Sequence, residues 1–130
     1  MTQLLLDTTF LIDVERGVHL ADVIADDDDV AIAAITIAEL RVGVLLADGR
    51  RRRARASYVD ELIEAIPIIA YDLRVAEAHS QLLVAVREQG RPRGAHDLII
   101  AATARSTARV VLTADARAFA ELPDVDVLSH

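Results

Sequence analysis

The chain contains no cysteine, no lysine, few aromatic residues and no long uninterrupted apolar run. Without cysteine there can be no disulfide and no thiolate metal site, which is typical of a cytoplasmic protein. A transmembrane helix needs about 18 consecutive apolar residues, and none is found. The N-terminal MTQLLLD also lacks the basic start of a secretory signal. We therefore expect a cytoplasmic protein that makes no use of a membrane.

The missing lysine argues against several α/β enzyme classes. A phosphoacceptor receiver domain relies on a lysine near the phosphoryl group. Haloacid-dehalogenase-like phosphatases need D-x-D near the first strand and typically a lysine, whereas this chain reads Asp7-Thr8-Thr9. No G-x-x-x-x-G-K is present, which excludes a P-loop. All fourteen basic residues are arginine, and the net charge of −7 is a poor match to indiscriminate nucleic-acid binding.

The length of 130 residues predicts a single domain, 1–130. Hydrophobic residues make up 53% of the chain and aromatic residues only 3%, so we expect a large aliphatic core. Short unbroken apolar runs predict parallel strands that are buried on both faces. Apolar residues at steps of three and four predict helices. The expected strands are 3–7, 30–35, 66–70, 109–113 and 125–128, and the expected helices are 9–16, 19–27, 37–48, 51–65, 73–89, 97–107 and 116–121.

Because strands alternate with helices, the fold class is predicted to be a three-layer α/β domain with a mainly parallel sheet flanked by helices. Four acidic residues are placed where such a fold collects its chemistry. Asp7, Glu39 and Asp115 fall at or just after the ends of expected strands. Asp97 opens the segment HDLIIAATA. Ligands bind at the carboxyl edge of open α/β sheets, and clustered carboxylates are tolerated mainly when a cation neutralises them.

Each of these acids also has an ordinary structural explanation. The segment from Thr36 to Glu39 matches a capping box, with Thr36 as the N-cap. Asp7, Asp97 and Asp115 could each be the N-cap of a following helix. Asp72 also follows a strand and opens a helix, and we assign it only a capping role. Position alone does not separate Asp72 from the other acids.

Two clusters of arginine could contact a binding partner. Arg50 to Arg53, with Arg55, open an expected helix, where positive charge opposes the helix dipole. They could form a solvated face that pairs with Asp60 or Glu61, or they could contact phosphate or a partner. Arg87, Arg91 and Arg93 lie in the loop before Asp97, and we expect Arg91 and Arg93 to contact an RNA backbone. For the first cluster, the solvated face and the contact with phosphate or a partner remain alternatives at the level of sequence.

Four motifs in order give the whole chain a resemblance to PIN-domain ribonucleases of the VapC type, the toxin half of bacterial toxin–antitoxin pairs. The resemblance implies that the metal-binding acids are Asp7, Glu39, Asp97 and Asp115. It implies supporting polar roles for Thr9 and Thr113, and we interpret His96 as non-catalytic. The motifs are LLLDTTFLID (4–13), ITIAELRVGV (35–44), GAHDLIIAATA (94–104) and VVLTADARAF (110–119).

The resemblance implies a three-layer PIN-like fold and an endoribonuclease that depends on Mg²⁺ or Mn²⁺. Such an enzyme would cleave a structured cellular RNA, such as a tRNA or rRNA, by attack of water on the phosphodiester, and so inhibit translation. It further implies a cognate VapB-type antitoxin and a homodimer. The helices that carry Leu40, Val44, Leu45, Leu62 and Ile63 offer apolar surface for either contact, although core burial also explains them.

Two functions from other classes remain open. The chain could be a PIN-like RNA-binding module without catalysis. It could also be an α/β metal-dependent phosphatase or a DNA nuclease. The complete set of four acids argues against a pure binding module, because binding alone would not need them.

Overall fold

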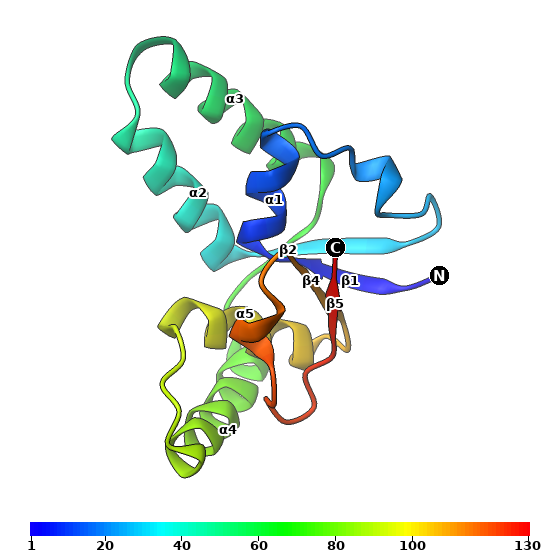
Figure 1. The fold of residues 1–130 in the computed structure, drawn as a ribbon, viewed down its shortest axis with the longest axis vertical. Helices are drawn as coiled ribbons and strands as arrows, with labels where there is room; N and C mark the ends of the chain where they lie inside the picture. Colours follow the sequence, from blue (N-terminus) through cyan, green and yellow to red (C-terminus); the bar gives the residue numbers. More distant parts are fainter.

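A computed structural model describes all of residues 1–130. It contains one five-stranded sheet in the order β3-β2-β1-β4-β5 (Figure 1). Every neighbouring pair of strands is parallel, so the expected mainly parallel sheet is in fact wholly parallel. The strands are β1 (Gln3–Leu6), β2 (Asp29–Ala33), β3 (Ile68–Ile69), β4 (Val110–Thr113) and β5 (Val127–Ser129).

Helices cover both faces of this sheet, which confirms the three-layer α/β class. None of them combines the length and the apolar character that crossing a membrane would need. The α-helices are α1 (Thr8–Glu15), α2 (Ala34–Leu46), α3 (Gly49–Ala65), α4 (Leu73–Gln89) and α5 (Ala95–Ser106). Two short 3₁₀ helices complete the fold, η1 (Leu20–Asp22) and η2 (Ala116–Phe119).

Two expected helices, 19–27 and 116–121, were wrong in extent, since each is only a short 3₁₀ helix. In the first case the 3₁₀ helix ends at Asp22, and the carboxylate of Asp28 accepts hydrogen bonds from the backbone N–H groups of Ala25 and Thr2. These bonds also hold the pKa of Asp28 below its ordinary value. In the second case Glu121 adopts a left-handed conformation with φ of 62°, which a continuing α-helix cannot contain.

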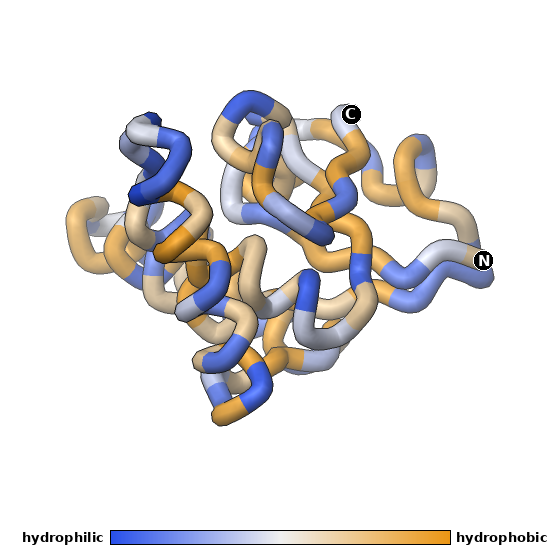
Figure 2. Tube along the Cα trace, turned by 90° about the horizontal axis from the view of Figure 1, so that it is seen from below, coloured by the Kyte–Doolittle hydropathy of each residue, from blue (hydrophilic) through white to orange (hydrophobic).

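The central strand β1 divides the core into two layers. Leu4 and Leu6 pack on the face covered by α1 and α3, and Leu5 packs on the face covered by α4 and α5. All three side chains are completely or almost completely buried. Burial of a leucine stabilises the fold by about 1.5–3 kcal/mol relative to exposure, so this tripeptide anchors both layers. In Figure 2 the hydrophobic strands run from the N-terminal edge into the middle of the molecule.

Two pairs of helices diverge from the sheet. Helices α2 and α3 extend to one end of the molecule as an antiparallel arm, and α4 extends to the opposite end beside α5 (Figure 1). From β1 the chain passes to β2 on one side and later to β4 on the other. The carboxyl ends of β1 and β4 therefore lie at the switch point, where open α/β sheets place their ligands.

Candidate active site

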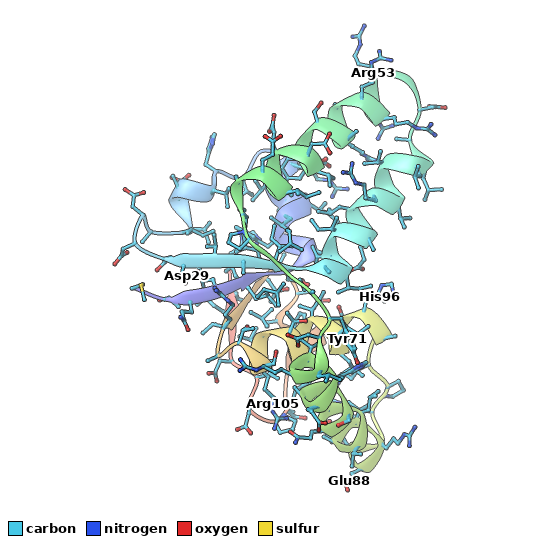
Figure 3. All side chains as sticks on the ribbon, turned by 180° about the vertical axis from the view of Figure 1, so that it is seen from behind. Asp29, Arg53, Tyr71, Glu88, His96 and Arg105 are labelled. Atoms are coloured by element: carbon cyan, nitrogen blue, oxygen red, sulfur yellow. The ribbon has the colours of Figure 1, made fainter.

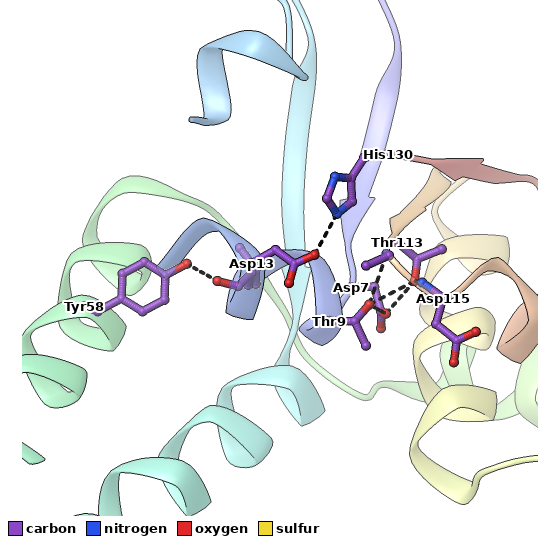
Figure 4. A network of polar contacts seen from close by, with 9 residues as sticks. Asp7, Thr9, Asp13, Tyr58, Thr113, Asp115 and His130 are labelled. Carbon is purple, nitrogen blue, oxygen red and sulfur yellow. Dashed lines mark hydrogen bonds and ion pairs between the residues drawn. The ribbon is translucent and has the colours of Figure 1, made fainter. Parts of the chain in front are cut away.

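Asp7 lies at the switch point, directly after β1, and its side chain is only 2% exposed. It occupies the N-cap position of α1, but its carboxylate makes no capping hydrogen bond. Instead Oδ2 accepts hydrogen bonds from the hydroxyls of Thr9 at 2.6 Å and Thr113 at 2.8 Å (Figure 4). The explanation of Asp7 as a simple cap is therefore wrong, and the carboxylate is oriented by two hydroxyl donors.

The two threonine hydroxyls have a defined direction of hydrogen bonding. Thr9 Oγ1 accepts from the backbone N–H of Ala114 at 3.1 Å, and Thr113 Oγ1 accepts from that of Asp115 at 2.9 Å. A hydroxyl has a single proton, so both protons are free to point to Asp7. The other oxygen of Asp7, Oδ1, receives no hydrogen bond from the protein and is not shut off from solvent. One oxygen is thus held and the other stays open to a ligand.

Glu39 is positioned by a different pair of threonines. Helix α2 begins at Ala34 with Ala33 as its N-cap, so the expected capping box at Thr36 and Glu39 was wrong. The hydroxyl of Thr8 donates to Glu39 Oε1 at 2.9 Å and lies 3.1 Å from the buried hydroxyl of Thr36. The side chain of Glu39 is therefore tied to the start of α1, beside Asp7.

Asp97 is the third residue of α5, whose N-cap is Gly94, so the expectation that Asp97 caps this helix was also wrong. Its carboxylate folds back over Gly94. A Cβ atom placed on Gly94 would lie 2.7 Å from Oδ2 of Asp97, which is closer than real Cβ contacts. The backbone of Gly94, with φ −60° and ψ 134°, would suit other residues equally well. The glycine therefore matters for the space that it leaves to Asp97.

The four predicted acids act on one another electrostatically. Burial raises the pKa of Asp97 above its ordinary value, and the negative charges of Asp7, Glu39 and Asp115 raise it further, in that order. The neighbouring His96 acts in the opposite direction. Three carboxylates from separate segments thus lie within electrostatic range of a fourth, although they are up to 108 positions apart in the chain.

Asp115 is the most open of the four acids. It stands at the N-cap position of η2, but its carboxylate makes no capping bond. Its backbone N–H group donates to the hydroxyl of Thr113, and Figure 4 shows Asp115 beside Thr113 and Asp7.

Asp72 behaves differently from the four predicted acids, because its carboxylate accepts a hydrogen bond from the N–H of Val75 at 3.0 Å. The assignment of Asp72 as a cap is confirmed, and none of the four predicted acids shares this bond.

No three His, Cys, Asp or Glu side chains are arranged so that they enclose an ion as they stand. The donor set nevertheless suits a hard divalent cation, because it consists of carboxylate oxygens. Mg²⁺ keeps several of its waters and is usually held by only one or two carboxylates. The open Oδ1 of Asp7 and the mutual repulsion felt at Asp97 both fit such an ion.

Three residues contribute to this arrangement although the sequence pattern did not predict these contacts: Thr8, Thr36 and Gly94. The run Asp7-Thr8-Thr9 could have indicated that Thr8 also orients an acid of the site. No local pattern indicated a role for Gly94. His96, interpreted as non-catalytic, is exposed, and its Nδ1 lies 3.5 Å from Oε2 of Glu39. A shallow hollow beside it is lined by Glu39 and by residues 94–97.

The loop before Asp97 is held by its own arginines. The guanidinium of Arg93 donates to the backbone carbonyls of Arg117, Ala118 and Ala120, and Arg91 forms an ion pair with Glu121. Arg93 therefore joins the loop before Asp97 to the segment after Asp115. Its hydrogen bonds give it a part in the fold that the sequence analysis did not foresee.

The chain is similar to known proteins over most of its length. A family model described as the PIN domain matches residues 4–125. Ribonuclease VapC5 of Mycobacterium tuberculosis is 36% identical over 85% of this chain and 81% of its own. Toxin FitB of Neisseria gonorrhoeae is 33% identical over 71% of this chain and 69% of its own.

Solved structures show the same fold over the full length. The VapBC-5 toxin–antitoxin structure from M. tuberculosis has a TM-score of 0.83 at 29% identity and covers all of both chains. VapBC2 of Rickettsia felis, solved with a promoter DNA fragment, has a TM-score of 0.88 at 19% identity and covers 99% of each chain. With a family model that spans nearly the whole chain and a relative above 30% identity, the chain belongs to the PIN-domain family, and within it to the VapC type.

Proposed function

We propose that this chain is an endoribonuclease toxin that depends on Mg²⁺ or Mn²⁺ and cleaves a structured cellular RNA, such as a tRNA or rRNA, so that translation stops. The observation that carries the proposal is that threonine hydroxyls orient the carboxylates of Asp7 and Glu39, whose charges also reach Asp97. Carboxylates that repel one another in the free protein are suited to bind a cation. The names of the relatives, ribonucleases and toxins, support the same reaction.

In this proposal the four acids bind the divalent ion, and the residues around them orient the carboxylates. Thr9 and Thr113 hold one oxygen of Asp7, which leaves the other for the ion. Thr8 orients Glu39, and Gly94 leaves room for Asp97. A divalent ion bound there lowers the pKa of water and stabilises the charge that develops on the phosphate. Hydrolysis by water leaves a 5′-phosphate and a 3′-hydroxyl, and no nucleophilic side chain is needed.

We propose a VapB-type antitoxin as the partner and a cytoplasmic location, and we retain the homodimer as part of this proposal. The relatives in VapBC and FitAB structures are toxin–antitoxin complexes. Of the apolar residues considered for such contacts, Val44 and Leu62 are buried in the core. Leu45 and Ile63 are exposed and remain available to a partner.

The proposed contact with RNA is now restricted to Arg91. An RNA phosphate would have to displace only Glu121 from the exposed Arg91. It would have to displace three backbone carbonyls from Arg93, and those carbonyls would lose their donor. Two of these contacts are partly buried, and a carbonyl there that loses its donor is unfavourable, so Arg93 is better explained as a support of the loop.

The deciding experiment compares RNA and DNA cleavage by the purified protein with Mn²⁺, with Mg²⁺ and with EDTA. We expect cleavage of RNA only, only with metal, and 5′-phosphate ends on the products. RNA binding without cleavage would indicate the binding module, and cleavage of DNA would indicate the nuclease alternative. Products with 2′,3′-cyclic phosphate would show attack by the RNA's own 2′-hydroxyl and would contradict the mechanism.

Gly94→Ala tests the site without altering an acid. The added methyl group would displace the Asp97 carboxylate, so we expect at least a tenfold loss of cleavage and a smaller thermal stabilisation by Mn²⁺. The metal-free stability should change by less than about 1 kcal/mol, because the weaker N-cap offsets the lower entropy of the unfolded chain. Gly43→Ala is the matched control, since the nearest atom to its Cβ would be 4.0 Å away. Equal Mn²⁺ stabilisation of the Gly94→Ala and Gly43→Ala proteins would contradict this role of Gly94.

A further inference from the structure

We propose that three arginines at the tip of the α2–α3 arm, Arg50, Arg51 and Arg53, form a surface that binds the RNA backbone beside the acidic site. Figure 3 shows Arg53 at the outer end of this arm and His96 at the start of α5, near the base of the arm. The inference rests on the proposed function, because it assigns to the same substrate a second place of contact. We call these three residues the arm-tip arginines.

The other two arginines of the cluster have a structural task. Arg52 donates to the backbone carbonyls of Ala47 at 2.7 Å and Leu45 at 2.9 Å, and Arg55 donates to that of Gly43 at 3.0 Å. These carbonyls belong to the last turn of α2 and to the residue that follows it, where the helix itself supplies no donor. Arg52 and Arg55 therefore join the two helices of the arm and explain part of the basic run.

The arm-tip arginines have no such task. All three are exposed, and none forms a hydrogen bond or an ion pair within the chain. The expectation that the run pairs with Asp60 was wrong, because Asp60 binds Arg41 at 2.7 Å. Asp48, which precedes α3, makes no capping hydrogen bond to it. No internal partner therefore accounts for these three charges.

Their position is unfavourable for the isolated protein. They lie in the first turns of α3, where the helix dipole is positive, and Arg50 and Arg53 repel each other as neighbours three positions apart. The chain as a whole is acidic, with a net charge of −7 that already includes these three arginines. A polyanion that has to approach such a protein needs a local positive surface, and these residues provide one.

Two neighbouring hollows lie between Arg51, at the arm tip, and Glu39 of the acidic site. A hollow between α1 and α3 is lined by Arg51, Arg55, Glu15 and Tyr58. The adjoining hollow, which shares Arg55 and Glu15 with the first, reaches Glu39. Along α2, the seven positions from Glu39 to Leu46 span about 10 Å. This length is on the order of the axial rise of three nucleotides of one strand in a duplex, about 3.4 Å each. An RNA with its scissile phosphate near Glu39 would therefore bring further phosphates to the arm tip.

The test compares a triple variant, Arg50→Gln with Arg51→Gln and Arg53→Gln, with a control of equal net charge, Arg74→Glu with Arg87→Gln. Arg74 and Arg87 are exposed on α4 and form no ion pair. Binding of a fluorescein-labelled 20-nucleotide single-stranded RNA and of bulk tRNA is measured in EDTA over a range of salt concentrations. We expect the triple variant to bind at least tenfold more weakly at low salt. We also expect the slope of log binding constant against log salt concentration to be smaller in magnitude by about 2 for this variant. Each lost phosphate contact reduces this slope by about 0.7, and three contacts are removed.

The outcomes separate this inference from the proposed function. In cleavage assays with Mn²⁺, the triple variant should show a raised KM and a nearly unchanged kcat. If the wild type cleaves RNA and the triple variant binds RNA like the control, the inference is overturned although the proposed function stands. If no RNA is cleaved but the triple variant alone loses binding, the inference stands and the nuclease assignment fails. A single Arg53→Gln variant, at an exposed position, should show about a third of the change in slope and guards against misfolding of the triple variant.

Discussion

Replacement of Asp7 by Asn is expected to reduce RNA cleavage by about 10²–10³-fold while the protein stays folded. Thr9 and Thr113 donate hydrogen bonds to Oδ2 of Asp7, so the amide oxygen of Asn would take that place. The NH₂ group would then face the open side, where it cannot bind a cation. Loss of metal-assisted stabilisation of several kcal/mol corresponds to this fall in rate.

The measurement combines cleavage by the purified protein with growth after induced expression in the absence of a partner. Wild type should arrest growth, and Asp7→Asn should relieve the arrest. Asp72→Asn is the matched control, because Asn caps a helix nearly as well as Asp and Asp72 lies in a cap. A soluble, folded Asp7→Asn protein that remained as toxic as wild type would remove Asp7 from the site.

Asp97→Asn is expected to give the metal-free protein a melting temperature at least as high as that of wild type. The pKa of Asp97 is raised in the folded protein by burial and by the charges of Asp7, Glu39 and Asp115. The ionised carboxylate is therefore less stable in the folded than in the unfolded chain. The protonated carboxyl of Asp97 therefore contributes to stability at low pH. This contribution is lost as the pH rises above the unfolded pKa of 3.8 and through the higher pKa of the folded protein. Asn does not titrate, so the free energy of unfolding of the variant should depend less on pH in that range.

The same substitution should nearly abolish the stabilisation by Mn²⁺. At a hundredfold excess of metal over Kd, wild type would gain about 2.7 kcal/mol, which is on the order of 8–10 °C for a domain of this size. If Asn weakens metal binding a hundredfold, the gain falls to about 0.4 kcal/mol. The measurement is a thermal melt of wild type, Asp97→Asn and Asp72→Asn, each with EDTA and with millimolar Mn²⁺. An equal shift in all three proteins would mean that Asp97 is not a ligand.

Several parts of the fold were predictable from the sequence because they depend on local pattern. The apolar runs at 3–7, 30–35 and 109–113 predicted the three central strands, which lie at Gln3–Leu6, Asp29–Ala33 and Val110–Thr113. The helix expected at 73–89 has those bounds in the structure. Side-chain periodicity and burial of both faces of a parallel strand are written into consecutive residues, so no distant contact is needed to recognise them.

The candidate acids were reached by order and spacing together with a family resemblance, since local pattern pointed equally to caps. Thr36 and Glu39 fit a capping box, yet the hydroxyl of Thr8 holds Glu39 and the helix begins two residues before Thr36. Asp72 and Asp7 both stand at N-cap positions, but only Asp72 caps. A carboxylate can accept either from a backbone N–H or from a hydroxyl, and the sequence does not say which donor is nearer.

The amino-acid sequence by itself determined the α/β class and the central strands, and together with the family resemblance it predicted the four acids as a set. Only the tertiary structure decided what each polar side chain binds. Thr113 reaches Asp7 across 106 positions, and Arg93 reaches Ala120 across 27. The tertiary structure also pairs Asp60 with Arg41, so Asp60 is not a partner of the arm-tip arginines. Hydrogen bonds form only within a narrow range of donor–acceptor distances, about 2.5–3.2 Å, and the packing of the layers decides which groups come that close.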